Sequence, residues 1–291
     1  MSSDFPEALV STQWLAGHLA DPGLRILDCT WHHASTNLDG RTQYRGRHIP
    51  GSVHFDIDHM ADKSSPLPHM LPKPADFANR VGLLGIGSGD RVVVYDRFFG
   101  GSAAARAWWM FRVFGHDRAA MLDGGYVKWI GENLPSDMAA VRPEPQSFTA
   151  AFTPSLVRNI GDMKANLLSG AEQVIDARGP GKFDGTQEDV FPFRKPGHIP
   201  GAVNVPWADL VNPETGVFLP PDALLARFAT AGIDLKRPIV TTCASGITSC
   251  AVALGLYLLG HETAAVYDGS WAEWSLDGDA PVEAALETAA P

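Results

Sequence analysis

Short apolar runs alternate with stretches of helical character along the chain. Leu24–Asp28, residues 92–95 and Ala119–Leu122 are mainly apolar, which predicts buried strands. Residues 75–81 and 103–114 lie between them and are predicted to form helices. Strands that alternate with helices predict an α/β fold, in which helices flank both faces of a parallel sheet. The ligand site of such a sheet lies beyond the carboxyl ends of its strands.

The whole pattern occurs twice, at an offset of about 150 residues. The copies share short words in the same order: Leu27-Asp28 with Ile175-Asp176, His48-Ile49-Pro50-Gly51 with His198-Ile199-Pro200-Gly201, residues 92–96 with 239–243, Phe114-Gly115-His116 with Leu259-Gly260-His261, and Leu122-Asp123-Gly124 with Tyr267-Asp268-Gly269. A repeat this long predicts two copies of one domain, since solenoid repeats have about 20 to 50 residues. We expect domains at residues 1–140 and 156–291, joined by a proline-containing linker at 141–155.

Composition and charge exclude several classes of protein. The 291 residues are 45% hydrophobic and 19% charged, which is ordinary globular usage. The net charge is −10 and the sequence has no basic block, so we expect no nucleic-acid partner. Residues 239–260 carry no formal charge, but polar residues interrupt their first half and leave about ten apolar residues, too few to cross a membrane. This segment predicts a buried strand, a polar loop and a buried helix, and we expect no membrane partner.

The cysteines and the first residues of the sequence bear on its compartment. Cys29, Cys243 and Cys250 are too few and too scattered for a disulfide framework, which favours a reducing compartment. The first residues lack the basic region and apolar run of a signal peptide, and their acidic residues argue against a transit peptide. We therefore expect a cytoplasmic protein. Cys29 and Cys250 are predicted to pack in the core, with a role as resolving thiols as the alternative.

The two copies differ at one turn between an apolar strand and a helix, where the first has Asp96 and the second has Cys243. Gly246, three residues after the cysteine, allows the chain to curl so that backbone amides point inward. The positive end of the following helix lies near the sulfur, and both effects favour thiolate over thiol. A buried structural cysteine is the alternative, but this small, polar turn favours a nucleophile.

Two kinds of enzyme hold a cysteine in such a loop, those that attack phosphorus and those that carry sulfur. The common phosphatase signature needs an arginine six residues after the cysteine, which binds the phosphate oxygens through its planar fork. This sequence has Ser249 at that position. A Cys phosphatase is therefore a remote alternative, and the residues favour sulfur transfer.

The chain resembles the two-domain sulfurtransferases of the rhodanese superfamily over nearly its whole length. The resemblance rests on Phe55-Asp56-Ile57-Asp58, His69-Met70-Leu71-Pro72, Trp108-Trp109-Met110-Phe111-Arg112, both His-Ile-Pro-Gly words, the cysteine loop and Asp268-Gly269-Ser270-Trp271. It implies tandem rhodanese-like domains with an inactive amino-terminal copy and a catalytic carboxyl-terminal copy, which matches the difference between Asp96 and Cys243. Some rhodanese-like modules are non-catalytic binding proteins, but these usually lack the cysteine.

The resemblance also implies a role for each site residue. Cys243 would take sulfur from a small-molecule donor, form a persulfide and pass the sulfur to cyanide or to a thiol acceptor, such as a small thiol or thioredoxin. Ser245, His69 and Asp58 would move the proton that this chemistry requires. The other loop residues would bind the substrate, namely Ala244, Gly246, Ile247 and Thr248. No cofactor is implied.

The donor is predicted from the loop and from the segment before the second His-Ile-Pro-Gly word. Neither residue directly after Cys243 is basic, which resembles the members that use 3-mercaptopyruvate more than those that use thiosulfate. Mercaptopyruvate members hold the donor carboxylate with two arginines, whose aligned positions here are Lys182 and Phe191. Arg194, three residues further on, is a candidate replacement. We expect 3-mercaptopyruvate as the donor, with thiosulfate as the alternative.

Histidines clustered in the first half raise one further interpretation. His54 and His59, with Asp56 or Asp58, are candidate metal ligands. The sequence has no cysteine pair or second histidine-rich group at the spacing of a metal site. No metal is therefore expected.

Overall fold

The computed structural model describes residues 8–98, 100–188 and 195–284. These residues form two five-stranded parallel sheets with the same strand order, β1-β5-β4-β2-β3 and β6-β10-β9-β7-β8. The first sheet comprises β1 (Leu9–Val10), β2 (Leu24–Asp28), β3 (Val53–His54), β4 (Arg91–Tyr95) and β5 (Ala119–Leu122), and the second comprises β6 (Val157–Arg158), β7 (Gln173–Asp176), β8 (Val203–Asn204), β9 (Ile239–Thr242) and β10 (Ala265–Tyr267). The predicted α/β fold with duplicated parallel sheets is confirmed.

Helices connect the strands of each sheet. In the first half they are α1 (Thr12–His18), the 3-10 turn η1 (Ala34–Thr36), α2 (Gly40–Gly46), α3 (Ile57–Met60), α4 (Pro74–Leu83), α5 (Ser102–Val113) and α6 (Gly125–Gly131). In the second half they are η2 (Pro154–Leu156), α7 (Ile160–Ser169), α8 (Pro180–Phe183), η3 (Trp207–Leu210), α9 (Pro221–Thr230), α10 (Thr248–Leu258) and α11 (Ser270–Trp274). The predicted helices at 75–81 and 103–114 correspond to α4 and α5.

The central strands are buried because helices cover both faces of each sheet. Val92, Val93 and Val94 of β4 are fully buried, although their side chains alternate between the two faces. In β9, Ile239 and Val240 are buried in the same way. This is why β4 is almost a continuous apolar run in the sequence, and why β9 combines two apolar residues with two buried threonines.

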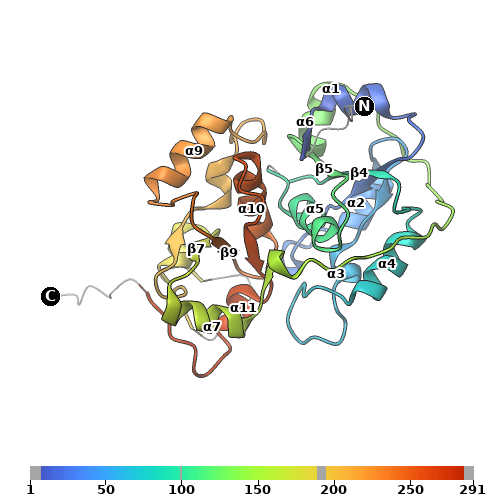
Figure 1. The fold of residues 1–291 in the computed structure, drawn as a ribbon. Coiled ribbons are helices and arrows are strands. Elements are labelled where there is room, and N and C mark those ends of the chain that lie inside the picture. The colour runs from blue at the N-terminus through green and yellow to red at the C-terminus, as the bar shows by residue number, and fades with distance from the viewer. Residues whose placement is uncertain (1–7, 99, 189–194, 285–291) are drawn as a thin grey trace.

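Helices α5 and α10 pack against each other where the two halves meet, as Figure 1 shows at the centre of the molecule. Both helices are buried along most of their length, and one hydrophobic cluster includes residues of both halves. A helix that is apolar nearly all round must be covered on every side.

None of the described helices combines the length and the apolar character that a membrane span requires.

Residues 138–153 contain no helix or strand and lead from the first half to η2 and β6. In Figure 1 this yellow-green segment crosses from one half to the other. The loops between β4 and α5, and between β9 and α10, lie at the carboxyl ends of central strands. Each of these loops is therefore placed where a parallel sheet presents its ligand site.

Candidate active site

Cys243 directly follows β9, and its loop is held from behind by the start of α11. The carbonyl of Cys243 accepts a hydrogen bond from the Trp271 amide, and the carbonyl of Ala244 accepts one from the Ala272 amide, both at 2.9 Å. The Cys243 amide donates to the Ser270 hydroxyl at 3.2 Å. Cys243 is only 1% exposed, yet it lines a cleft of about 230 Å³. The sulfur is therefore reached through the cleft.

The loop carbonyls turn away from the cleft, so the loop amides turn toward it. The C=O and N–H groups of one peptide point in opposite directions. Among the described residues, no protein acceptor binds the amides of residues 244–249. Such converging amides at the start of α10 favour a negative charge, whether a thiolate, a persulfide or an anionic donor.

Gly246 is required by the path of this loop. Its φ of 79° is a conformation that L side chains rarely adopt. A Cβ at this position would also lie 2.7 Å from the carbonyl oxygen of Asp268. Gly246 is not among the residues that line the cleft. Its predicted role in binding the substrate stays a prediction, and what the structure shows is that Gly246 shapes the loop.

Asp58, His69 and Ser245 form a hydrogen-bonded chain that joins the two halves. His69 Nε2 lies 3.1 Å from Asp58 Oδ1, and His69 Nδ1 lies 3.0 Å from Ser245 Oγ. A carboxylate only accepts hydrogen bonds, so Nε2 carries the hydrogen in this pair. In neutral imidazole the other nitrogen, Nδ1, then accepts the hydroxyl hydrogen of Ser245. The hydroxyl oxygen is left basic beside the cleft.

Asp58 is held by a second partner besides His69. Burial raises its pKa, but hydrogen bonds from His69 and Trp31 outweigh this, and the pKa of Asp58 lies below its usual value. The Trp31 indole donates to Asp58 Oδ2 at 2.7 Å, and its ring meets the His69 ring edge-on at 5.0 Å between centroids. Trp31 therefore orients both members of the pair, and it also lines the cleft.

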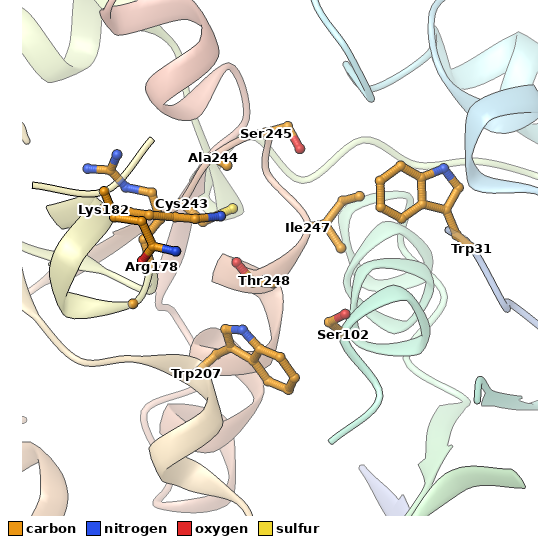
Figure 2. A pocket seen from close by; sticks show the side chains of 12 residues that line it. Trp31, Ser102, Arg178, Lys182, Trp207, Cys243, Ala244, Ser245, Ile247 and Thr248 are labelled. Carbon is orange, nitrogen blue, oxygen red and sulfur yellow. The ribbon is translucent and has the colours of Figure 1, made fainter. Parts of the chain in front are cut away.

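Two cations line the cleft near the sulfur. Arg178 is bound to Asp176 through Nε and Nη2, at distances from 2.7 to 3.0 Å, which fixes its guanidinium. Lys182 on α8 extends toward the Cys243 sulfur in Figure 2. Since both side chains are positively charged, the cleft suits an anionic donor.

The other residues predicted from the sequence fall into three groups. Ala244, Ile247 and Thr248 line the cleft as predicted. Phe191 and Arg194 lie outside the described residues. Further cleft residues were not predicted as site residues, namely Trp31, Ser102, Arg178, Gly179, Gln187 and Trp207. Indole rings at a cleft have no local sequence signal, because the topology alone brings them there.

The alternative roles raised for other residues have no support in the geometry. Within the described ranges, no three His, Cys, Asp or Glu side chains gather as a metal site. His54 Nδ1 bonds the Asp28 carbonyl at 3.1 Å, and Asp56 caps α3 through two backbone amides.

Burial raises the pKa of the Cys250 thiol to about 12, and it also raises that of Cys29 well above its usual value. Both thiols are therefore packed in protonated form.

Comparisons with known proteins agree with this geometry. The family model for the rhodanese-like domain matches twice, at residues 11–132 and 159–277. Human 3-mercaptopyruvate sulfurtransferase is 43% identical over 272 residues, and bovine thiosulfate sulfurtransferase is 42% identical over 273, each alignment covering 92% of this chain and 91% of the relative. The crystal structure of SseA from Escherichia coli, a 3-mercaptopyruvate sulfotransferase, is 36% identical with a TM-score of 0.83, covering 91% of this chain and 99% of that one. The chain belongs to the rhodanese family, with two rhodanese-like domains and sulfurtransferases as curated relatives.

Proposed function

We propose that this protein transfers sulfur from 3-mercaptopyruvate, through a persulfide on Cys243, to an acceptor thiol or to cyanide. One observation carries the proposal. Cys243 lies in a cleft whose wall includes Ser245, and the hydroxyl of Ser245 is bonded to an imidazole–carboxylate pair from the other half of the chain. This arrangement supplies a nucleophile, a path for one proton and a cradle of amides for negative charge.

The first step forms the persulfide. The thiol proton of Cys243 passes through the Ser245 hydroxyl to His69, and Asp58 stabilises the resulting imidazolium. The Cys243 thiolate attacks the donor sulfur, and the bond between that sulfur and the donor carbon breaks, leaving its electron pair on carbon. The pyruvate enolate formed in this way takes the proton back from His69. One S–S bond has replaced one S–C bond, and no oxidant is needed.

The second step empties the site. An acceptor thiolate, or cyanide, attacks the outer sulfur of the persulfide and leaves with it, which restores the Cys243 thiolate. The loop amides that favour the first thiolate also favour this leaving group. A small thiol or thioredoxin is the proposed acceptor. A cleft of about 230 Å³ admits a small thiol, whereas thioredoxin would have to present its thiol at the mouth of the cleft. Ping-pong kinetics are expected.

The donor anion is proposed to bind against Lys182 and Arg178. Arg178 is ion-paired with Asp176, and Lys182 also lines the cleft beside Cys243, so both positive charges attract the donor anion. A lysine ammonium is a point charge, without the two-pronged grip that arginine gives a carboxylate. It suits thiosulfate as well as a carboxylate, which keeps thiosulfate as the second candidate donor. The nearly equal identities to relatives of both names support the same two donors.

Two further parts of the proposal concern organisation and location. The first half, with Asp96 in place of the cysteine, is proposed as the inactive copy, and residues 141–155 as the linker to the catalytic copy. The cytoplasm is the proposed compartment, supported by the free thiols of Cys29, Cys243 and Cys250. A plant relative, from Arabidopsis thaliana, is named as mitochondrial. Cell fractionation of the source organism tests this assignment.

The test is sulfur transfer to cyanide, measured as thiocyanate with each donor in turn. We expect a higher kcat/KM with 3-mercaptopyruvate than with thiosulfate, and no turnover above background in Cys243→Ala. Lys182→Met should raise the KM for 3-mercaptopyruvate about 10-fold or more, because one charge-assisted contact to the donor is lost. A higher kcat/KM with thiosulfate would overturn the donor assignment. Activity that survives in Cys243→Ala would overturn the mechanism.

A further inference from the structure

A buried arginine from the first half of the chain binds the catalytic loop of the second half. Arg106 lies in α5 and is 1% exposed. Its Nη1 donates to the Gly246 carbonyl at 3.0 Å, and its Nη2 donates to the His69 carbonyl at 2.5 Å and to Asp268 Oδ1 at 2.7 Å. The guanidinium also lies 4.6 Å from the centroid of the Trp109 ring. One planar group therefore holds three segments of chain that are distant in sequence.

The bond to Gly246 sets the direction of a loop amide. The Gly246 carbonyl and the Ile247 amide belong to one peptide and point in opposite directions. Because Arg106 holds this carbonyl in the interface, the Ile247 amide is directed to the cleft side of the loop. The Cys250 thiol, 3.2 Å from the same carbonyl, supports this orientation.

The bond to His69 fixes a strained backbone position. His69 has a φ of 60°, a conformation that L side chains rarely adopt. Its carbonyl is bound by Arg106, and two residues later the Leu71 amide donates to Asp268 Oδ2 at 2.7 Å. The same Arg106–Asp268 pair therefore holds the backbone on both sides of the turn. This places the imidazole 3.0 Å from the Ser245 hydroxyl.

The corresponding position in the other half lacks this group. The shared words align Arg106 of α5 with residues 251–253 of α10, which are Ala, Val and Ala. The two helices pack on each other, yet among the described residues α5 gives an arginine to the loop that carries Cys243, and α10 gives none to the loop at Asp96. A buried ion pair is often no more stabilising than apolar residues of the same size, so stability alone does not account for this pair.

We infer that Arg106 is a positioning residue for sulfur transfer. It holds the loop amides and the His69 imidazole in the positions that the reaction at Cys243 requires. The inference rests on the proposed reaction at Cys243. It assigns to the inactive half a second contribution to the site, in addition to the Asp58–His69 pair. Arg106 does not touch the sulfur, and it acts through the backbone of Gly246 and His69.

The test is Arg106→Lys, which keeps the charge beside Asp268 but loses the planar fork. Arg112→Lys is the matched control, because Arg112 also lies on α5 and binds across the halves, to the Glu262 carbonyl at 3.1 Å. Four quantities are measured in both variants: kcat, KM, the melting temperature, and the pH midpoint of Cys243 alkylation by iodoacetamide. Cys243→Ala reports any background alkylation of the other thiols.

We expect Arg106→Lys to lower kcat about 10- to 100-fold with KM within about 3-fold, since small misplacements at a reacting centre cost rates of this order. The alkylation midpoint should rise by about one pH unit, because the sulfur loses aligned amides. Arg112→Lys should leave kcat within about 2-fold of the wild type and the alkylation midpoint unchanged. A folded Arg106→Lys protein with normal kcat and a normal midpoint would overturn the inference, as would a change in KM alone.

A second variant covers the case in which Arg106→Lys does not fold. Arg106→Met combined with Asp268→Asn removes both charges, so no buried charge is left without a partner. The inference predicts the same loss in kcat and the same rise in the midpoint for this folded protein, and normal values would overturn it. If the wild type transferred no sulfur from either donor, the proposed function would fail, while the alkylation midpoint would still decide the role of Arg106.

Discussion

The loop at Asp96 and the loop at Cys243 occupy the same place in the two halves, at the end of a central strand and before the helix at the domain boundary. The backbone of each loop is held by an equivalent hydrogen bond. The Asp96 carbonyl accepts a hydrogen bond from the Tyr126 amide at 2.9 Å, just as the Cys243 carbonyl accepts one from Trp271 at 2.9 Å. A Cβ on Gly125 would lie 2.7 Å from the Asp96 carbonyl oxygen, so the start of α6 packs closely against the first loop.

The two loops differ in what their amides bind. In the first loop the Asp96 carboxylate accepts the amides of Phe98, Ala103 and Ala104, each at 2.9 Å. In the second loop the amides of residues 244–249 have no acceptor within the described part of the chain. The first loop therefore supplies the acceptor for its own amides, whereas the amides of the second loop have no such acceptor among the described residues. The same strand–loop–helix position therefore holds a loop closed by a carboxyl in one half and a loop that opens on a cleft at Cys243 in the other.

The largest expected effect on turnover comes from adding a methyl group at Gly246 in the second loop. Gly246→Ala should lower kcat about 10³-fold, because the new Cβ would lie 2.7 Å from the Asp268 carbonyl oxygen and displace the loop amides. Gly260→Ala is the matched control. Its φ of 82° is similarly positive, but no atom lies within 4 Å of the added Cβ. It should lose about 1 kcal/mol of unfolding free energy and keep its turnover. Equal kcat losses in both variants would show that backbone strain alone, rather than loop position, controls activity.

A smaller effect is expected at the proton path, which the first loop lacks. Ser245→Ala should lower kcat about 10²-fold, because the hydrogen-bonded link between the cleft and His69 is removed. His69→Asn should have a similar effect, and the double variant should be little worse than either single one, because the two residues act as a unit. Steady-state rates of the three variants test this coupling. Additive losses would place Ser245 and His69 in separate roles.

Much of the fold could be predicted because its signals are local. Buried parallel strands are typically apolar runs in the sequence. A duplicated domain repeats short sequence motifs, and here the same four residues begin at His48 and at His198. The difference between Asp96 and Cys243 could be found for the same reason, because the matching motifs on either side align these two positions.

The contacts that complete the site could not be predicted from local patterns. Arg106 and Gly246 are 140 positions apart, and only the packing of α5 on α10 brings them together. The two arginines of an otherwise apolar helix, Arg106 and Arg112, were the one available signal, since a charge in such a helix is rarely buried without a partner. Trp31 gave no signal of this kind, because an indole at a cleft and an indole in a core look alike in sequence.

The smallest effect on turnover, and the clearest on stability, is expected at Asp96. Burial raises its pKa from 3.8 to about 7, although three backbone amides act in the opposite direction. Between pH 4 and 7 the carboxyl is then protonated in the folded protein and ionised in the unfolded chain, so stability falls as pH rises through this range, by about 4 kcal/mol in total.

Asp96→Asn cannot titrate and isolates this contribution. Relative to the variant, the wild type should lose about 4 kcal/mol of unfolding free energy between pH 4 and pH 7.5, measured by urea denaturation at each pH. Other groups cancel in the difference because both proteins share them. The kcat of the folded variant should stay within about 2-fold of the wild type, because Asp96 is not among the described residues that line the cleft at Cys243. If the unfolding free energies of the wild type and the variant changed with pH in parallel, the three amides would be holding the Asp96 carboxylate ionised over the whole pH range. The first loop would then bind an anion, as the second loop is proposed to do.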